Sequence, residues 1–254
     1  MENYQQRIFI INIFSKRERV FQLVGFFLFL FSWEILSVII ANPILFPSLH
    51  DIFFSLISIL STGESYTCIG FTILRIAITI ILDLAFALVL GLLAGMYREI
   101  EHILLPLENV LRSLPSVAVI LIMLIWFKSN ITPILVGSLA VFPLLYRSIV
   151  DAVKHIEPKF IELSNDFKVP TKTKIRFLYL PHIMIALKTA LVSSFGLGVK
   201  VVVTSELLSQ PKYGIGAALQ IAKIQLNTAD IFAWAVISLF IIFVSHLTFK
   251  VKLL

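Results

Sequence analysis

Long runs of apolar residues, separated by short polar stretches, dominate this sequence. An α-helix rises 1.5 Å per residue, so about 20 consecutive apolar residues cross the hydrocarbon layer of a bilayer. Six runs come near this length: 20–41, 71–96, 104–127, 131–149, 183–205 and 231–249. Only 14% of the residues are charged, against roughly 25% in soluble domains. We therefore predict an all-α, polytopic membrane protein with about six transmembrane helices.

The third run is the weakest of the six as a membrane span. Arg112 and Pro115 leave an unbroken apolar segment only from Ser116 to Phe127, which is too short to cross a bilayer alone. Proline removes a backbone donor and its ring clashes with the preceding turn of a helix. The sequence therefore predicts either a kinked span or a cytoplasmic helix followed by a short apolar helix.

The chain is predicted to form one membrane domain, because 254 residues leave no room for a second globular unit of typical size. A basic segment precedes the first apolar run, with positive charges at Arg7, Lys16, Arg17 and Arg19. A secretion signal would have a shorter apolar region and a small-residue cleavage site. We interpret residues 1–19 as a cytoplasmic segment and residues 20–254 as the transmembrane domain, with the first helix retained.

Basic residues are distributed unevenly between the two sides of the predicted spans. One side carries the N-terminal basic segment and further positive charges at Arg98, Arg112, seven positions from Arg147 to Arg176, Lys250 and Lys252. The other side carries only Lys128, Lys212 and Lys223. The positive-inside rule places the basic side and both termini in the cytoplasm. Membrane topology thus accounts for the net charge of +6, and no nucleic-acid partner is predicted.

Small residues recur every four positions in two of the runs. They are Ala87, Gly91 and Gly95 in the second run, and Ala186, Ala190, Ser194 and Gly198 in the fifth. Small side chains at this spacing let helix backbones approach closely inside a bilayer. We predict that these two helices use these faces for packing.

The loop over residues 151–182 is the longest predicted cytoplasmic loop. Glu157 precedes Pro158, which favours a helix start, and Pro170 ends the pattern. Between them, Phe160, Ile161, Leu163 and Phe167 form an apolar face. A short amphipathic helix of this kind rests on the bilayer surface or inserts into a groove of another protein.

Several short motifs carry a resemblance to a known family. Within the loop, Glu162-Leu163-Ser164 is followed after a gap by Leu180-Pro181. Further motifs are Trp33-Glu34, NPILFPS at 42–48, LLPLENVLRSLPSVAVILIMLIWF at 104–127, Glu206, and YGIG at 213–216. Together they resemble the nitrate/sulfonate/taurine branch of ABC-type importer permeases, whose cytoplasmic loop carries an "EAA" motif. The sequence departs from that motif where the family has two alanines (Leu163, Ser164), a glycine (Lys168) and a second proline (near Ile185).

The resemblance implies a type I ABC importer permease-like bundle in a bacterial inner membrane. Two copies of such a permease, as a homodimer, form the pathway for a small solute, in particular an anion such as a sulfonate or nitrate, or a vitamin precursor. The implied partners are an ABC ATPase subunit, which binds ATP and Mg, and an extracytoplasmic solute-binding protein, besides membrane lipid. The loop helix would be the coupling helix, with ATPase contacts from Glu157, Phe160, Ile161, Glu162, Leu163, Ser164, Phe167 and Lys168.

The sequence lacks the motifs of nucleotide, metal and catalytic sites. It has no G-x-x-x-x-G-K-[ST] phosphate loop, no H-E-x-x-H motif and no Cys/His metal spacing, and Cys68 is its single cysteine. We therefore predict that the chain is no enzyme and holds neither metal nor cofactor. An intramembrane enzyme is disfavoured because no paired catalytic residues are found.

Five charged residues fall in or near the predicted spans: Glu34, Arg75, Asp83, Lys188 and Lys200. Charges that face lipid are costly, so each should snorkel, form an ion pair, or face protein or water. Arg75 and Lys188 are predicted to snorkel from span ends. The deeper Lys200 shares one helical stripe with Ser193, Gly196 and Thr204.

Lys200 has two interpretations. In the first, the stripe lines the pathway and Lys200 favours an anionic solute. In the second, Lys200 forms a structural ion pair with Asp83 or Glu34. The alternative function is an ion- or proton-coupled secondary transporter, in which Glu34, Asp83 and Lys200 would carry the ions or protons.

Overall fold

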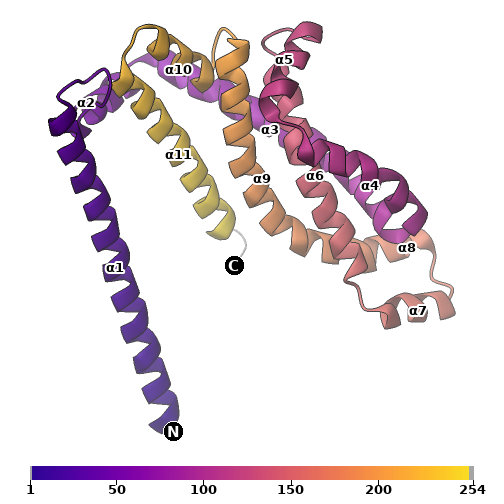
Figure 1. The fold of residues 1–254 in the computed structure, drawn as a ribbon. Helices are drawn as coiled ribbons and strands as arrows, with labels where there is room; N and C mark the ends of the chain where they lie inside the picture. The colour runs from indigo at the N-terminus through magenta and orange to yellow at the C-terminus, as the bar shows by residue number, and fades with distance from the viewer. Residues whose placement is uncertain (1, 252–254) are drawn as a thin grey trace.

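The computed structural model describes residues 2–251, and the regular elements within this range are all helices (Figure 1). Five segments are long and apolar enough to cross a membrane: Val20–Ile40, Gly63–Met96, Thr132–Lys154, Thr171–Ser209 and Thr228–Thr248. A bent pair of helices makes a sixth when it is counted as one span. The prediction of an all-α membrane protein with about six spans is confirmed. Residue 1 and residues 252–254, including the basic Lys252, lie outside the described range.

The bent pair corresponds to the interrupted third run. Helix α4 (Arg98–Ser113) and helix α5 (Ser116–Trp126) meet at an angle of 99°. Pro115, which has no N–H group to continue α4, lies in the break between them. Helix α4 is amphipathic because Glu101 and Glu108 are buried on one face while Ile103 and Leu107 are exposed on another.

Helices α3 (Gly63–Met96), α6 (Thr132–Lys154) and α9 (Leu180–Ser209) form the centre of the bundle. A Cβ atom on Gly91 would lie 2.9 Å from Ile149, and one on Gly95 would lie 2.5 Å from Val153. The residue four positions later in α3 therefore meets the residue four positions later in α6. The two helices run in the same direction, and their backbones are closely spaced.

Helix α9 runs in the opposite direction and packs against both α3 and α6. A Cβ atom on Gly198 would lie 3.4 Å from Ile76 of α3 and 3.8 Å from Val141 of α6. Ala190 and Ser194 are buried, and Ala186 is half-buried. The small residues of α9 thus lie on its inner face, as does the fully buried Ala87 of α3.

Helix α1 (Glu2–Ile40) stands apart from this bundle (Figure 1). The predicted N-terminal segment and the first span form one continuous helix of 39 residues. Its contacts lie near its C-terminal end, where the Trp33 indole N–H donates to the Pro47 carbonyl oxygen at 3.1 Å. Glu34 accepts from the Leu49 backbone N–H at 3.1 Å, so this charged residue holds the loop that follows α1.

The remaining short elements gather at the two ends of the bundle (Figure 1). Helix α2 (Leu49–Leu60), helix α10 (Ile215–Ile224) and the beginning of α11 (Thr228–Val251) lie at one end. Helix α7 (Pro158–Asp166) lies at the other end, followed by α8 (Thr171–Lys174) and a π-helical turn, η1 (Ile175–Tyr179). The chain thus offers two distinct surfaces, a broad one at the α10 end and a single projecting helix at the α7 end.

Candidate functional site

Helix α7 projects from the bundle, and its local sequence fixes where it begins and ends. Glu157 is its N-cap and Pro158 its first residue, where the fixed φ of proline suits a helix start. Lys168, two residues beyond the last helical residue, has a φ of +51°. This left-handed conformation is the one that glycine adopts most easily after a helix.

One exposed face of α7 is apolar. Phe160, Leu163 and Phe167 are 44%, 53% and 75% exposed, while Ile161 is half-buried against the bundle core. A groove of about 290 Å³ lies beside these side chains and continues over Phe177 of η1. Ser164 lines this groove, whereas Glu162 and Lys168 are exposed but do not line it. Large apolar side chains exposed in this way are typical of a protein-interaction surface.

Helix α7 is attached to the next element by a polar contact. The Lys174 ammonium donates to the Asn165 side-chain oxygen at 2.5 Å, and Lys159 forms an ion pair with Glu157. The Ser164 hydroxyl donates to the Ile161 carbonyl oxygen at 2.7 Å. Motion of α7 would therefore reach α9 directly, since α8, η1 and α9 follow one another without a break.

The predicted polar stripe lies on the outer face of α9. Ser193, Lys200 and Thr204 are exposed and Gly196 is half-buried, on the side opposite the buried Ser194 and Gly198. In the part of the chain that the structure describes, Lys200 takes part in no ion pair. Within this chain, Lys200 is therefore paired with neither Asp83 nor Glu34.

The three charged residues considered for ion coupling are not brought together. Glu34 binds a backbone N–H after α1, whereas Asp83 is buried at 3% exposure in α3. One Asp83 carboxylate oxygen, Oδ2, has no hydrogen-bond partner among the described residues. Lys188, which was predicted to snorkel, is exposed on α9.

Arg75 does not snorkel as predicted but is buried in an ion pair. Its Nη1 lies 2.6 Å from Glu206 Oε1, and the two side chains are 6% and 0% exposed. The prediction failed because α3 begins at Gly63, eight residues before the predicted start at 71, so Arg75 lies well inside the helix. Arg75 Nη1 also donates to the Tyr213 carbonyl oxygen at 2.8 Å.

The remaining acceptor positions of Glu206 are filled from α3 and α10. The Thr72 hydroxyl donates to Glu206 Oε2 at 2.8 Å, and the Gly216 N–H donates to the same oxygen at 3.0 Å. A Cβ atom on Gly214 would lie 2.6 Å from the Glu206 carboxylate, and its φ of +156° is rare for other residues. The YGIG segment therefore folds over the ion pair and joins α3, α9 and α10.

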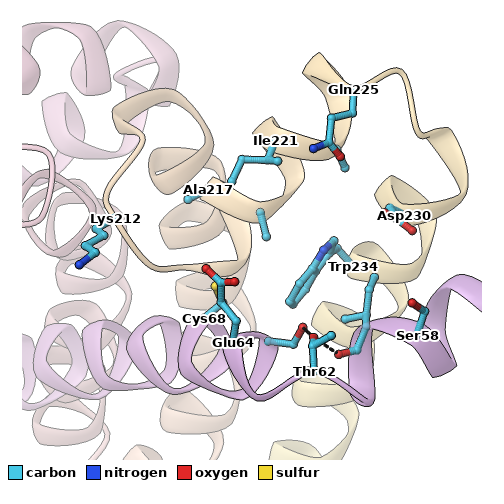
Figure 2. Close-up of a pocket in the computed structure, with 14 residues that line it drawn as sticks. Ser58, Thr62, Glu64, Cys68, Lys212, Ala217, Ile221, Gln225, Asp230 and Trp234 are labelled. Atoms are coloured by element: carbon cyan, nitrogen blue, oxygen red, sulfur yellow. Dashed lines mark hydrogen bonds between the residues drawn. The ribbon is translucent and has the colours of Figure 1, made fainter.

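A pocket of about 280 Å³ opens at the α10 end, between α2, α3, α10 and α11 (Figure 2). Its base is formed by Cys68, Ala217 and Trp234, and its rim carries the charges of Glu64, Lys212 and Asp230. Asp230 accepts a hydrogen bond of 2.6 Å from the Ser55 hydroxyl. The rim is polar, so this surface suits contact with water or a hydrophilic partner.

No group of three or more His, Cys, Asp or Glu side chains that could hold a metal ion occurs among the described residues. The surfaces found are a projecting apolar helix, a polar stripe on a membrane helix, a buried structural ion pair and a polar pocket.

Comparison with known proteins gives the family of this membrane bundle. Residues 87–251 match the family of binding-protein-dependent transport system inner membrane components. The chain therefore belongs to this family, and the resemblance found in the sequence is confirmed.

Named relatives are similar over most of the chain. An ABC transporter permease protein of Methanocaldococcus jannaschii is 28% identical over 75% of this chain and 73% of its own length. A Bacillus subtilis protein named as an aliphatic sulfonates transport permease, SsuC, is 22% identical over 81% of this chain and 75% of its own length. The taurine transport system permease protein TauC of Escherichia coli is 23% identical over 85% of this chain and 80% of its own length.

A solved structure has the same fold. A chain of the MetNI methionine ABC transporter, in an inward facing conformation, superimposes with a TM-score of 0.56 at 15% identity. The similarity covers 75% of this chain and 93% of that one. The chain is thus a multi-pass permease subunit of the ABC transporter type.

Proposed function

We propose that two copies of this chain form the transmembrane pathway of an ATP-driven, binding-protein-dependent importer. In this proposal a separate ATPase subunit binds ATP and Mg at the α7 end, and an extracytoplasmic solute-binding protein docks at the α10 end. The family match and the permease relatives support the class.

The observation that carries the proposal is helix α7. A nine-residue helix projects from the membrane bundle with Phe160, Leu163 and Phe167 exposed beside an apolar groove. A helix of this kind suits insertion into a cleft of a partner protein. Helix α7 contacts α8 through the Lys174–Asn165 hydrogen bond, and α8, η1 and α9 follow one another without a break. Closure of the ATPase would therefore shift α9, and with it the equilibrium between inward-open and outward-open states.

The distribution of basic residues supports a cytoplasmic location for α7. Seven Lys and Arg residues lie between Arg147 and Arg176, whereas the α10 end carries Lys128, Lys212 and Lys223. By the positive-inside rule the α7 end faces the cytoplasm. The start of α1 is then also cytoplasmic, and the polar pocket near Trp234 faces the receptor side.

The first prediction tests the docking role of α7. Phe160→Asp should reduce the amount of ATPase subunit that co-purifies with the permease by about tenfold, because a charge in an apolar contact costs at least about 1.4 kcal/mol. ATP-driven uptake should fall in parallel. The measurement is quantitative pull-down of the ABC ATPase subunit with the permease from the same cells, followed by uptake in vesicles.

Asp166→Ala is the matched control, because Asp166 is exposed on the same helix but does not line the groove. It should leave the ATPase bound. Full retention of the ATPase by a folded Phe160→Asp permease would remove the docking role of α7.

The polar stripe of α9 supports a pathway for an anionic solute. Ser193, Lys200 and Thr204 are exposed on a helix that crosses the membrane, and an ammonium group is costly against lipid. A second copy facing this stripe would enclose it in a polar channel, with Lys200 as its positive charge. Relatives named for aliphatic sulfonates and taurine agree with an anionic group on the solute.

The second prediction concerns this charge. Lys200→Gln should lower the rate of sulfonate uptake by about tenfold, since loss of one close charge pair is worth at least about 1.4 kcal/mol at intermediate dielectric. Lys188→Gln is the control, because Lys188 is also exposed on α9 but lies about a third of a turn away from the stripe. Normal folding of Lys200→Gln with unchanged uptake would contradict the pathway role.

A further inference from the structure

A wholly apolar crevice of about 420 Å³ opens between helices α2, α3 and α11. Its lining comes from Leu56 and Leu60 of α2, Tyr66 and Ile69 of α3, and Val236, Ile237, Phe240 and Ile241 of α11. No polar surface lines it. Ile237 at its base is buried in the apolar cluster around Trp234. The crevice is therefore a fixed feature of three packed helices.

The depth of the crevice follows from the helices that form it. Tyr66 lies near the beginning of α3, and its hydroxyl donates to the Leu60 carbonyl oxygen at 2.8 Å. Tyrosine in this setting marks the boundary between headgroups and hydrocarbon. From there the crevice continues to Phe240 and Ile241, near the middle of the span Thr228–Thr248. It extends from the membrane surface to about half the membrane depth, on the α10 side.

Helix α2 closes the crevice at the surface end. Its 12 residues are too few to cross a bilayer, and it joins the end of α1 to the start of α3. Phe53, Phe54 and Ile57 are exposed on its outer face, a composition that suits a helix lying in the headgroup region. The crevice is thus continuous with the surface by which this end of the chain contacts lipid.

We propose that the crevice binds one acyl chain of a phospholipid from the leaflet at the α10 end. A hydrocarbon chain enters from the headgroup level and ends within one leaflet, as the crevice does, and it needs no polar partner. A transmembrane helix about 10 Å wide would continue through both leaflets, so it fits this half-depth crevice poorly. The bound lipid would hold α2 against α11, independently of which solute the protein carries.

The test places a photoreactive residue at the crevice in the full-length permease. Phe240 and Phe243 are replaced separately by p-benzoylphenylalanine; both are exposed, at 64% and 59%, but only Phe240 lines the crevice. The protein is reconstituted in phosphatidylethanolamine and phosphatidylglycerol, extracted, washed extensively in lipid-free detergent and then irradiated. Mass spectrometry should find about ten times more phospholipid adduct at position 240 than at 243, as 1.4 kcal/mol of preferential binding would give.

A second pair of variants keeps the test independent of the photoreactive group. Val236→Trp should fill the crevice and lower the number of phospholipids retained after washing by one per chain, while Val244→Trp should not. Val236 and Val244 lie on the same helix and are 44% and 41% exposed. Equal adducts at positions 240 and 243 would overturn the proposal. A cross-linked permease dimer through position 240 would also overturn it, because the occupant would then be a second copy.

Discussion

Arg75→Met is expected to lower the free energy of unfolding of the permease by about 3–5 kcal/mol, the usual result of removing one partner from a buried ion pair. Glu206 is fully buried and its carboxylate lies 2.6 Å from the Arg75 guanidinium. Without Arg75 its charge would remain in an apolar interior, and the Tyr213 carbonyl oxygen would lose a donor. Chemical unfolding in detergent and the amount of protein in the membrane would measure the effect.

The double variant Arg75→Met/Glu206→Gln is the matched control. Glutamine has no charge, yet its oxygen can still accept from Thr72 and Gly216, which now donate to Glu206 Oε2. The double variant should therefore recover more than half of the stability that Arg75→Met loses. A double variant as unstable as the single one would mean that Arg75 acts through packing and not through its charge.

This ion pair also shows why part of the structure could not be predicted from the sequence. Arg75 and Glu206 are 131 positions apart, and no local pattern links them. The apolar run predicted to begin at 71 excluded the polar first turns of α3, which starts at Gly63. A polar residue that would be costly against lipid is tolerated where it is buried among other helices. The hydropathy of the sequence therefore predicts a shorter helix than the structure contains.

Elements governed by local chemistry were predicted well. The interruption at Pro115 became a bend of 99° between α4 and α5, because proline cannot continue the hydrogen bonds of α4. The short helix predicted between Glu157 and Pro170 is α7. Its role as a coupling helix rests on partner contacts that a single chain does not contain, and it stays a prediction.

The residues that join the membrane helices at the α10 end could be suspected but not assigned from the sequence. YGIG and Glu206 are motifs of the sequence, and the structure explains physically why these residues occur together. Gly216 approaches the α9 backbone so closely that a side chain has no space, and its N–H group completes the hydrogen bonds of Glu206. The YGIG motif and the packing of α10 against α9 therefore depend on the same close contact between these two helices.

Gly216→Ala should consequently lower the free energy of unfolding by about 3 kcal/mol or more, because overpacking against rigid atoms forces the backbone to move. The new Cβ atom would lie 2.2 Å from the Val203 carbonyl oxygen and 2.5 Å from the Leu207 nitrogen. These are backbone atoms of α9 and cannot rotate away. Separation of α10 from α9 would also lengthen the Gly216 hydrogen bond to Glu206.

Gly70→Ala provides the comparison, since a Cβ atom on Gly70 of α3 would have nothing within 4 Å. Alanine favours a helix over glycine by up to about 1 kcal/mol, so this variant should be as stable as the wild type or slightly more stable. Both variants would be unfolded in the same detergent and compared with the wild type. Equal stability of Gly216→Ala and Gly70→Ala would show that α10 can move without cost in free energy. That result would contradict a rigid junction between α3, α9 and α10.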